Sequence, residues 1–157
     1  SIYSIRTQNI FGAILPGVYK EIGGRKMIHI LITSHGGMAE GMMQSVKMLV
    51  GEQEHLDYVT FGEEMGSDEL DELYGEKITG VSPDNQYLVL CDIKGGTPFN
   101  VVSRYSFKNE DVAVIYGMNL PILIEAIVQC GNPDIKLKDL AEYLQQQSVT
   151  TIGLSEL

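Results

Sequence analysis

Apolar runs of strand length recur along this chain and alternate with stretches of helical periodicity. Four of these runs are bounded by polar or glycine-rich segments: 28–33, 56–61, 86–92 and 112–116. Because the runs are almost continuously apolar, they predict strands that are covered on both faces, as in a parallel sheet.

Helices are predicted between and after these strands. In 38–50 the apolar residues fall on one face at helical spacing. Further helices are predicted at 67–74, 97–107, 120–130 and 137–147. Three residues are predicted to cap helix N-termini: Ser67, Asn119, and Thr97 with Pro98 after it. Gly131 is expected to end its helix in the left-handed conformation.

Strands that alternate with helices indicate an α/β fold. We predict an open, doubly wound, mostly parallel sheet with helices on both faces and right-handed crossovers. A final strand is predicted at 149–154, after the last helix. This strand could join the sheet edge of its own chain or that of a partner chain. No internal repeat or linker marks a second domain.

The domain is predicted to span 27–157. Met27 directly precedes the first strand, so we interpret 1–26 as an N-terminal extension of artificial or upstream origin. No apolar run is long enough to cross a bilayer, and no signal peptide is recognised. Cys91 and Cys130 have no paired spacing, and we interpret them as reduced packing residues of a cytoplasmic protein.

The charge distribution argues against nucleic acid as a partner. The formal net charge is −10, and residues 1–26 contribute +3, so the remaining residues carry −13. A phosphate backbone would repel a domain of this charge. A basic protein is the more compatible partner.

Two chemically active side chains stand at the ends of predicted strands. His35 follows the first strand and Asp92 closes the third. We expect them to meet, because ligands of open α/β sheets bind at the carboxyl ends of the strands. An imidazole can accept a phosphoryl group on one ring nitrogen when an acceptor holds the other as N–H. We predict that His35 and Asp92 form such a pair.

Backbone N–H groups beside this pair are predicted to hold the phosphoryl oxygens. The candidates are Gly36, Gly37, Gly96 and Thr97, whose hydroxyl can also donate. The other two histidines receive structural interpretations. His29 is expected to be packed or hydrogen-bonded in the first strand, and His55 to be solvated in a loop.

Several other chemistries lack their sequence motifs. The chain has no G-x-x-x-x-G-K-[ST] loop for nucleotide phosphates and no G-x-S-x-G nucleophile elbow. Its three histidines stand in unrelated settings without zinc-ligand spacing. We therefore expect neither a metal nor another cofactor.

Three segments stand at successive predicted strand exits: MIHILITSHGGMAEG at 27–41, CDIKGGTPFN at 91–100 and GMNLP at 117–121. In this order and spacing they resemble the mannose-family enzyme IIA component (EIIA) of the bacterial phosphoenolpyruvate-dependent sugar phosphotransferase system (PTS). The resemblance covers nearly all of 27–157. The extension at 1–26 departs from the family pattern.

The resemblance implies a phosphotransferase with a phosphohistidine intermediate. His35 would take the phosphoryl group from the phosphocarrier HPr and pass it to a cognate EIIB protein, with Asp92 as its hydrogen-bond partner. The membrane components EIIC and EIID would take part only indirectly. The pocket for the phosphoryl group would include Gly95, Gly96, Thr97 and Asn100, with 117–121 as an adjoining wall. The family also implies a homodimer that exchanges the strand 149–154.

Two alternatives remain open at the level of sequence. His35 could report sugar status within a regulatory protein, or the chain could be the phosphotransfer subunit of dihydroxyacetone kinase. The segment GGTPFN is closer to the sugar transporters. The sequence reveals neither the sugar nor the phosphorylated ring nitrogen, although an Asp92 contact to Nδ1 would leave Nε2 as the nucleophile.

Overall fold

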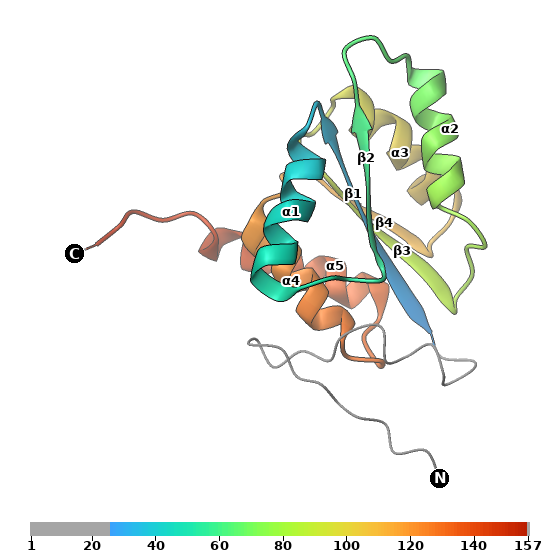
Figure 1. Cartoon of the computed structure of the whole chain (residues 1–157). Helices are drawn as coiled ribbons and strands as arrows, with labels where there is room; N and C mark the ends of the chain where they lie inside the picture. The colour runs from blue at the N-terminus through green and yellow to red at the C-terminus, as the bar shows by residue number, and fades with distance from the viewer. Residues whose placement is uncertain (1–25, 157) are drawn as a thin grey trace.

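A four-stranded parallel sheet forms the centre of the molecule (Figure 1). The computed structural model describes residues 26–156. The strands are β1 (Met27–His35), β2 (Leu56–Phe61), β3 (Asn85–Cys91) and β4 (Val112–Ile115), in the order β2-β1-β3-β4. β1 is therefore a central strand, and its last residue, His35, lies opposite Phe61 of β2.

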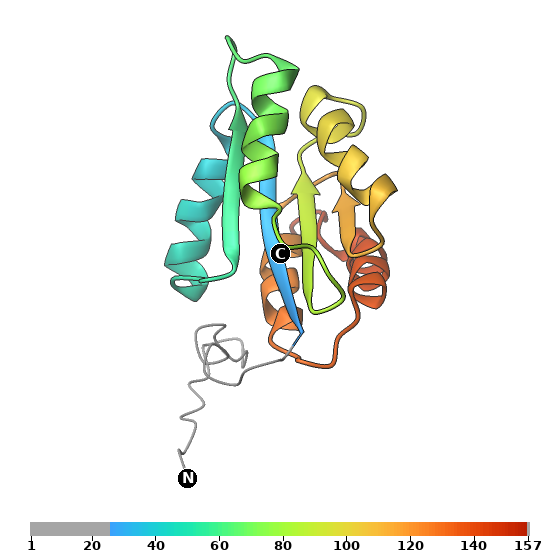
Figure 2. The ribbon, with the colours of Figure 1, turned by 90° about the vertical axis from the view of Figure 1, so that its right-hand side faces the viewer.

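Helices cover both faces of this sheet (Figures 1 and 2). The helices are α1 (Met38–Val50), α2 (Ser67–Lys77), α3 (Thr97–Lys108), α4 (Leu120–Cys130) and α5 (Leu137–Gln147). Apolar side chains of α1, α4 and α5 form one core with the sheet, and those of α2 and α3 form the other. The predicted α/β class with a parallel, two-sided sheet is confirmed.

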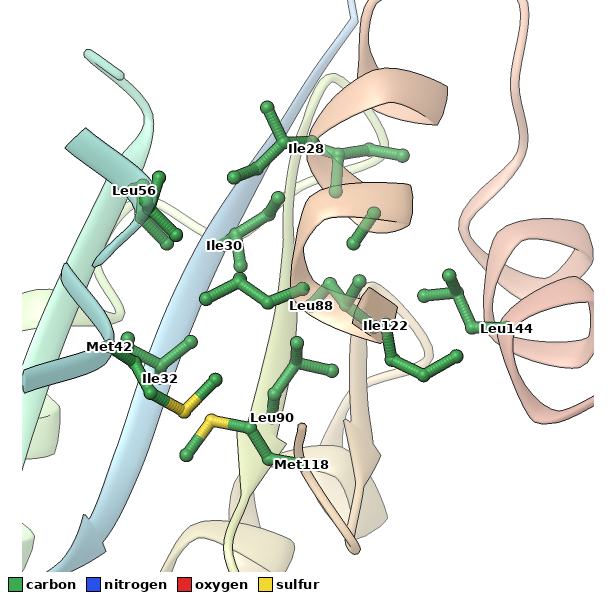
Figure 3. Close-up of a cluster of buried hydrophobic side chains, with 14 of the residues drawn as sticks. Ile28, Ile30, Ile32, Met42, Leu56, Leu88, Leu90, Met118, Ile122 and Leu144 are labelled. Carbon is green, nitrogen blue, oxygen red and sulfur yellow. The ribbon is translucent and has the colours of Figure 1, made fainter. Parts of the chain in front are cut away.

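The alternation of side chains along β1 supplies both cores. Ile28, Ile30 and Ile32 point to the first core, where they pack with Leu88 and Leu90 of β3 (Figure 3). The intervening positions face the other layer, where Leu31 is buried. Successive strand residues point to opposite faces, so a central strand needs apolar residues throughout. Burial on both faces holds the end of β1 firmly in place.

The predicted strands and helices form near the expected positions. The elements at 38–50, 56–61 and 137–147 have the predicted bounds, while α2 runs on to Lys77. Asn119 caps α4 as predicted, because its side-chain oxygen accepts from the N–H of Ile122 at 3.0 Å. Gly131 has a φ of −68°, so the left-handed prediction is wrong. Its N–H instead closes a tight turn onto Val128.

Two predicted N-caps are wrong by one residue. Ser67 and Thr97 are the first helical residues, and the caps are Gly66 and Gly96. Both glycines have extended backbone conformations, with ψ values of 165° and 167°. An N-cap residue has a non-helical backbone, and glycine adopts one at little cost. Neither helix has a side-chain capping bond.

The strand predicted at 149–154 is absent from the described chain. Ser148–Thr150 instead forms a single 3₁₀ turn, and 152–156 has no regular structure. Hydroxyl groups of Ser148, Thr150 and Thr151 donate to carbonyls three residues earlier. These local bonds continue the helical path and compete with an extended backbone. The C-terminal tail, residues 149–156, extends away from the rest of the molecule (Figure 1), and its Leu154 is 93% exposed.

Within residues 26–156, no helix has both the length and the apolar character that crossing a bilayer requires. Most of the predicted extension at 1–26 lies outside the described residues.

Candidate active site

His35 and Asp92 meet at the carboxyl edge of the sheet. His35 is the last residue of β1, and Asp92 follows β3, the neighbouring strand. The Nδ1 of His35 lies 2.7 Å from Oδ2 of Asp92, and the backbone N–H of His35 donates to the same oxygen at 2.8 Å. Two bonds to one carboxylate oxygen fix both the backbone and the ring of His35. The predicted contact between these residues is confirmed.

The carboxylate of Asp92 is stabilised in its charged form. Burial alone would raise the pKa of Asp92, but hydrogen bonds from the backbone and ring of His35 and from the N–H of Ile93 outweigh it. The net pKa of Asp92 is lower than that of an ordinary aspartate. An ionised carboxylate only accepts hydrogen bonds, so Nδ1 of His35 must carry the proton. In the neutral ring, the Nε2 atom then carries the lone pair.

The Nε2 side of the ring faces Gly96. A side chain at Gly96 would place its Cβ 2.7 Å from Cε1 and 3.3 Å from Nε2 of His35. Only glycine leaves room for the imidazole here. Because Gly96 is the N-cap of α3, the ring lies against the N-terminus of a helix. Free backbone N–H groups and the helix dipole favour an anion at such a position.

The other predicted phosphate-binding residues differ in their structural roles. Gly36 has a φ of 55°, and its N–H donates to the carbonyl of Phe61 at 2.9 Å, so this N–H is already used. Gly37 is the N-cap of α1. Asn100 donates from its side chain to the carbonyl of Gly95 at 3.0 Å and so braces the glycine turn. These contacts shape the loops on both sides of His35.

Thr97 is half-buried as the first residue of α3, directly after the glycine that touches His35. Its hydroxyl forms no capping hydrogen bond with the backbone of the helix. His35 itself is well exposed, with 44% of its side-chain surface accessible, whereas the Asp92 side chain is only 10% accessible. The site therefore presents an open imidazole above a covered carboxylate.

Two residues that support the site, Phe61 and Ser34, were not predicted from the sequence. The ring of Phe61 meets that of His35 edge to face, with centroids 5.8 Å apart. The hydroxyl of Ser34 accepts from the N–H of Ala39 at 2.8 Å and ties the end of β1 to α1. The position of Phe61 at the end of the strand beside β1 was a usable signal. Nothing in the sequence pattern distinguished Ser34.

The remaining histidines lie far from this edge. His29 bonds Oδ1 of Asn85 through Nε2 at 2.6 Å and stacks on Tyr87, as expected for a packed residue. His55 is half-buried, with its ring 5.2 Å from that of His29. The prediction that His55 is solvated is therefore wrong, because it packs against a strand residue.

Both cysteines are free, as predicted. Burial raises the pKa of Cys91 and of Cys130 to about 12, so both remain thiols at neutral pH. Within residues 26–156, no group of three or more His, Cys, Asp or Glu side chains is arranged to hold a metal ion.

Comparisons with known proteins agree with this architecture. The family model "PTS system fructose IIA component" matches residues 29–145. The fructose-specific EIIA component of Bacillus subtilis is 31% identical over 78% of this chain and 82% of that protein. The mannose-specific EIIAB component of Escherichia coli K12 is 35% identical over 64% of this chain. The chain spans only 31% of that longer relative.

Solved structures give the same result. An EIIA component from Streptococcus agalactiae aligns with a TM-score of 0.74 at 30% identity and covers 81% of this chain and 96% of that one. A mannose/sorbose-specific IIA subunit from Enterococcus faecalis also has a TM-score of 0.74 at 30% identity, with coverages of 83% and 96%.

The fold and the comparisons together define a component of a sugar phosphotransferase system. The chain belongs to the mannose/fructose-type EIIA family and is a phosphotransfer component of a sugar PTS. These relatives favour sugar uptake over the regulatory and dihydroxyacetone kinase alternatives.

Proposed function

We propose that Nε2 of His35 accepts the phosphoryl group from phosphorylated HPr and donates it to a cognate EIIB protein. The observation that carries this proposal is the 2.7 Å contact between Nδ1 of His35 and Asp92, which leaves Nε2 as the nucleophilic nitrogen. Family membership supports the donor and the acceptor. We assign this activity to a domain at 27–157, with 1–26 as an extension.

The proposed transfer is a displacement at phosphorus. The lone pair of Nε2 attacks, a nitrogen–phosphorus bond forms, and the bond from phosphorus to the donor breaks with its electron pair returning to HPr. The proton on Nδ1 stays on His35, where Asp92 balances the positive charge that develops on the ring. Transfer to EIIB repeats these events with His35 as the leaving group. No cofactor takes part in the proposed steps.

Backbone groups would bind the phosphoryl oxygens in this proposal. The N-terminus of α3 at Gly96 and Thr97 is the nearest source of donors, and the Thr97 hydroxyl adds one more. Gly37, as the N-cap of α1, is on the other side of His35. Gly36, Gly95 and Asn100 would act by shaping the loops that carry these donors. Phosphoryl transfer depends chiefly on such positioning and charge stabilisation.

Charge complementarity supports the proposed partner. The chain has a net charge of −10, and Asp68 and Glu69 lie in the first turn of α2, which follows the strand that ends beside His35. An acidic surface speeds association with a basic phosphocarrier. EIIC and EIID would select the sugar in the membrane, and this chain would work in the cytoplasm beside them. The sugar is therefore not determined by the residues of this site.

We also propose a homodimer in which the C-terminal tails are exchanged. Strand β4 lies at the edge of the sheet, and a groove of about 400 Å³ runs beside it along α5. The tail exposes Val149, Ile152 and Leu154, which are 81%, 87% and 93% accessible. An exposed strand edge is a ready template for a strand from another chain. The tail of a partner would cover both the edge and the groove.

Removal of residues 149–157 is expected to convert the dimer into a monomer. In the proposed dimer, the exposed apolar side chains of the tail are buried against the partner subunit. The truncated chain lacks these side chains and therefore loses this contact. Sedimentation equilibrium of the full chain and the truncated chain measures the difference. A full-length chain that remains monomeric at high micromolar concentration would contradict the exchange.

Delivery of phosphate distinguishes a carrier from a sensor. The chain is labelled with phosphoenolpyruvate, enzyme I and HPr, repurified, and then mixed with EIIB. We expect one acid-labile phosphate per chain and its appearance on EIIB. Labelled protein that retains its phosphate in the presence of each EIIB of the same organism would refute the carrier function.

Asp92→Asn is expected to slow phosphoryl transfer by about tenfold to a hundredfold. This range corresponds to the loss of a charge-assisted hydrogen bond of roughly 1.5–3 kcal/mol. Single-turnover transfer from phosphorylated HPr measures the rate, and thermal melting measures stability. An unchanged rate with a large melting loss would mean that Asp92 serves only the fold.

The same variant tests the charge of Asp92 by its pH dependence. The folded-state pKa of Asp92 is lowered, so its stabilising contribution is full above the ordinary aspartate pKa of about 4 and is lost as pH falls through the lower folded value. The stability difference between wild type and Asp92→Asn should therefore shrink as the pH falls below 5. Urea denaturation at each pH measures it, and a difference that grows with acid would contradict the assignment.

A further inference from the structure

Lys94 is held over an aromatic ring at the rim of the site. Its Nζ lies 5.5 Å from the ring centroid of Tyr116, within the range of a cation–π interaction. Tyr116 in turn meets the ring of Phe99 edge to face, with centroids 5.8 Å apart. We call Tyr116 and Phe99 the aromatic platform. Neither ring nor the lysine belongs to the machinery described above.

The aromatic platform borders the loop that contacts His35. Tyr116 directly follows β4, and the next residue, Gly117, donates its N–H to the carbonyl of Asp92 at 3.1 Å. Phe99 lies in the first turn of α3, the helix whose N-cap touches the imidazole. Lys94 lies between Asp92 and Gly96 in sequence. Lys94 and the aromatic platform are thus adjacent to the edge of the sheet at which His35 lies.

Lys94 has no carboxylate partner among residues 26–156. Three other lysines of this acidic chain form ion pairs, Lys47 with Glu52, Lys77 with Asp57, and Lys138 with Glu142, whereas Lys108 and Lys136 of the described chain, like Lys94, form none. Lys94 is exposed, and among residues 26–156 it has no hydrogen bond or ion pair beside its contact with Tyr116, which is itself 50% exposed. A cation–π contact at an exposed site is weak, so the ammonium can leave the ring readily.

A phosphoryl group on His35 would create a demand for positive charge. It carries between one and two negative charges at neutral pH and would sit beside the ionised Asp92, whose charge repels it. Consecutive Cα atoms are about 3.8 Å apart, so the Cα of Lys94 lies within about 7.6 Å of that of Gly96. Since Gly96 touches the ring of His35, the flexible lysine stem can bring its ammonium to the phosphoryl oxygens.

We propose that Lys94 leaves the aromatic platform when His35 is phosphorylated and binds the phosphoryl group as its counter-cation. This inference rests on the proposed phosphorylation of His35. Lys94 is then a binding residue that contacts the transferred group. Tyr116 holds the ammonium near the site, away from the acidic side chains elsewhere on the chain, while the site is empty.

The test uses phosphorylation by phosphoramidate, a small donor that needs no protein partner. The full-length proteins compared are wild type, Lys94→Met, Lys94→Arg and Lys108→Met. Lys108 is an exposed lysine in the last turn of α3, so its replacement removes the same charge at the far end of that helix. Phosphorus NMR follows both the rate of phosphorylation and the pH titration of the phosphoryl group.

A nearby cation favours the more highly charged form of the phosphoryl group. Lys94→Met should therefore raise the titration midpoint by about half a pH unit or more and slow phosphorylation by about tenfold. Lys94→Arg and Lys108→Met should remain close to wild type. In wild type, the ring-current shift of the Lys94 ε protons over Tyr116 should disappear on phosphorylation.

An unchanged midpoint and rate in Lys94→Met would overturn the inference. So would a defect seen with HPr but not with phosphoramidate, because Lys94 would then serve only partner docking. If wild type itself gains no phosphate on His35 from HPr, the proposed function fails first. The two failures are therefore distinguished by the wild-type protein.

Discussion

His35→Ala should gain no phosphate when it is incubated with phosphoenolpyruvate, enzyme I and HPr. Wild type should gain one acid-labile phosphate under the same conditions. The reason is chemical, since alanine has no nitrogen to attack phosphorus and neither of the other histidines lies at the carboxyl edge of the sheet. Mass spectrometry of the intact chain measures the difference, which should be complete.

The fold should survive this substitution. The His35 side chain is 44% accessible and belongs to neither core cluster. Its loss removes the ring bond to Asp92 but leaves the backbone bond from residue 35 in place. His55→Gln is the matched control, because it removes a different imidazole from the same chain, and it should be phosphorylated normally. Phosphorylation of His35→Ala would contradict the assignment of His35 as the phosphoryl acceptor.

Gly96→Ala should slow phosphoryl transfer by roughly tenfold to a hundredfold. The new methyl group would lie 2.7 Å from Cε1 of His35, closer than carbon atoms can pack, so the ring or the α3 N-terminus must move. Overpacking of this kind costs about 1–3 kcal/mol, and each 1.4 kcal/mol lost at the transition state is about tenfold in rate. Transfer from phosphorylated HPr at saturating concentration measures the rate.

Gly66→Ala is the matched control for this steric effect. Gly66 is also a helix N-cap with an extended backbone, and a Cβ there would meet nothing within 4 Å. Both substitutions therefore change the same kind of backbone position, but only one adds a methyl group against His35. Gly66→Ala should transfer at nearly the wild-type rate. Equal rates in both variants would show that Gly96 does not control the ring.

Much of the fold followed from the hydrophobic pattern. Continuously apolar strands predicted a two-sided parallel sheet, and that topology brought His35 and Asp92 to one edge from positions 57 residues apart. The pairing could be predicted because parallel strands end on the same side of a sheet. The resemblance of three segments to the EIIA family then supplied the chemistry, and the comparisons agree with it.

Other features could not be predicted because they depend on three-dimensional packing. The closeness of Gly96 to the imidazole depends on how α3 approaches the sheet. Ser67 and Thr97 were good capping residues by type, but a glycine before each one took the extended position. The tail from 149 has the composition of a strand, yet it has no partner strand within the described chain. The resting position of Lys94 on Tyr116 joins two loops that are distant in sequence.

The central claim is that Asp92 holds Nδ1 of His35 so that Nε2 carries the phosphoryl group. Nitrogen-15 NMR of the phosphorylated chain, with labelled histidine and detection of phosphorus coupling, tests it directly. We expect a single phosphohistidine, at position 35, with the coupling on Nε2 and a protonated Nδ1. Coupling on Nδ1, or on His29 or His55, would contradict this account of the site.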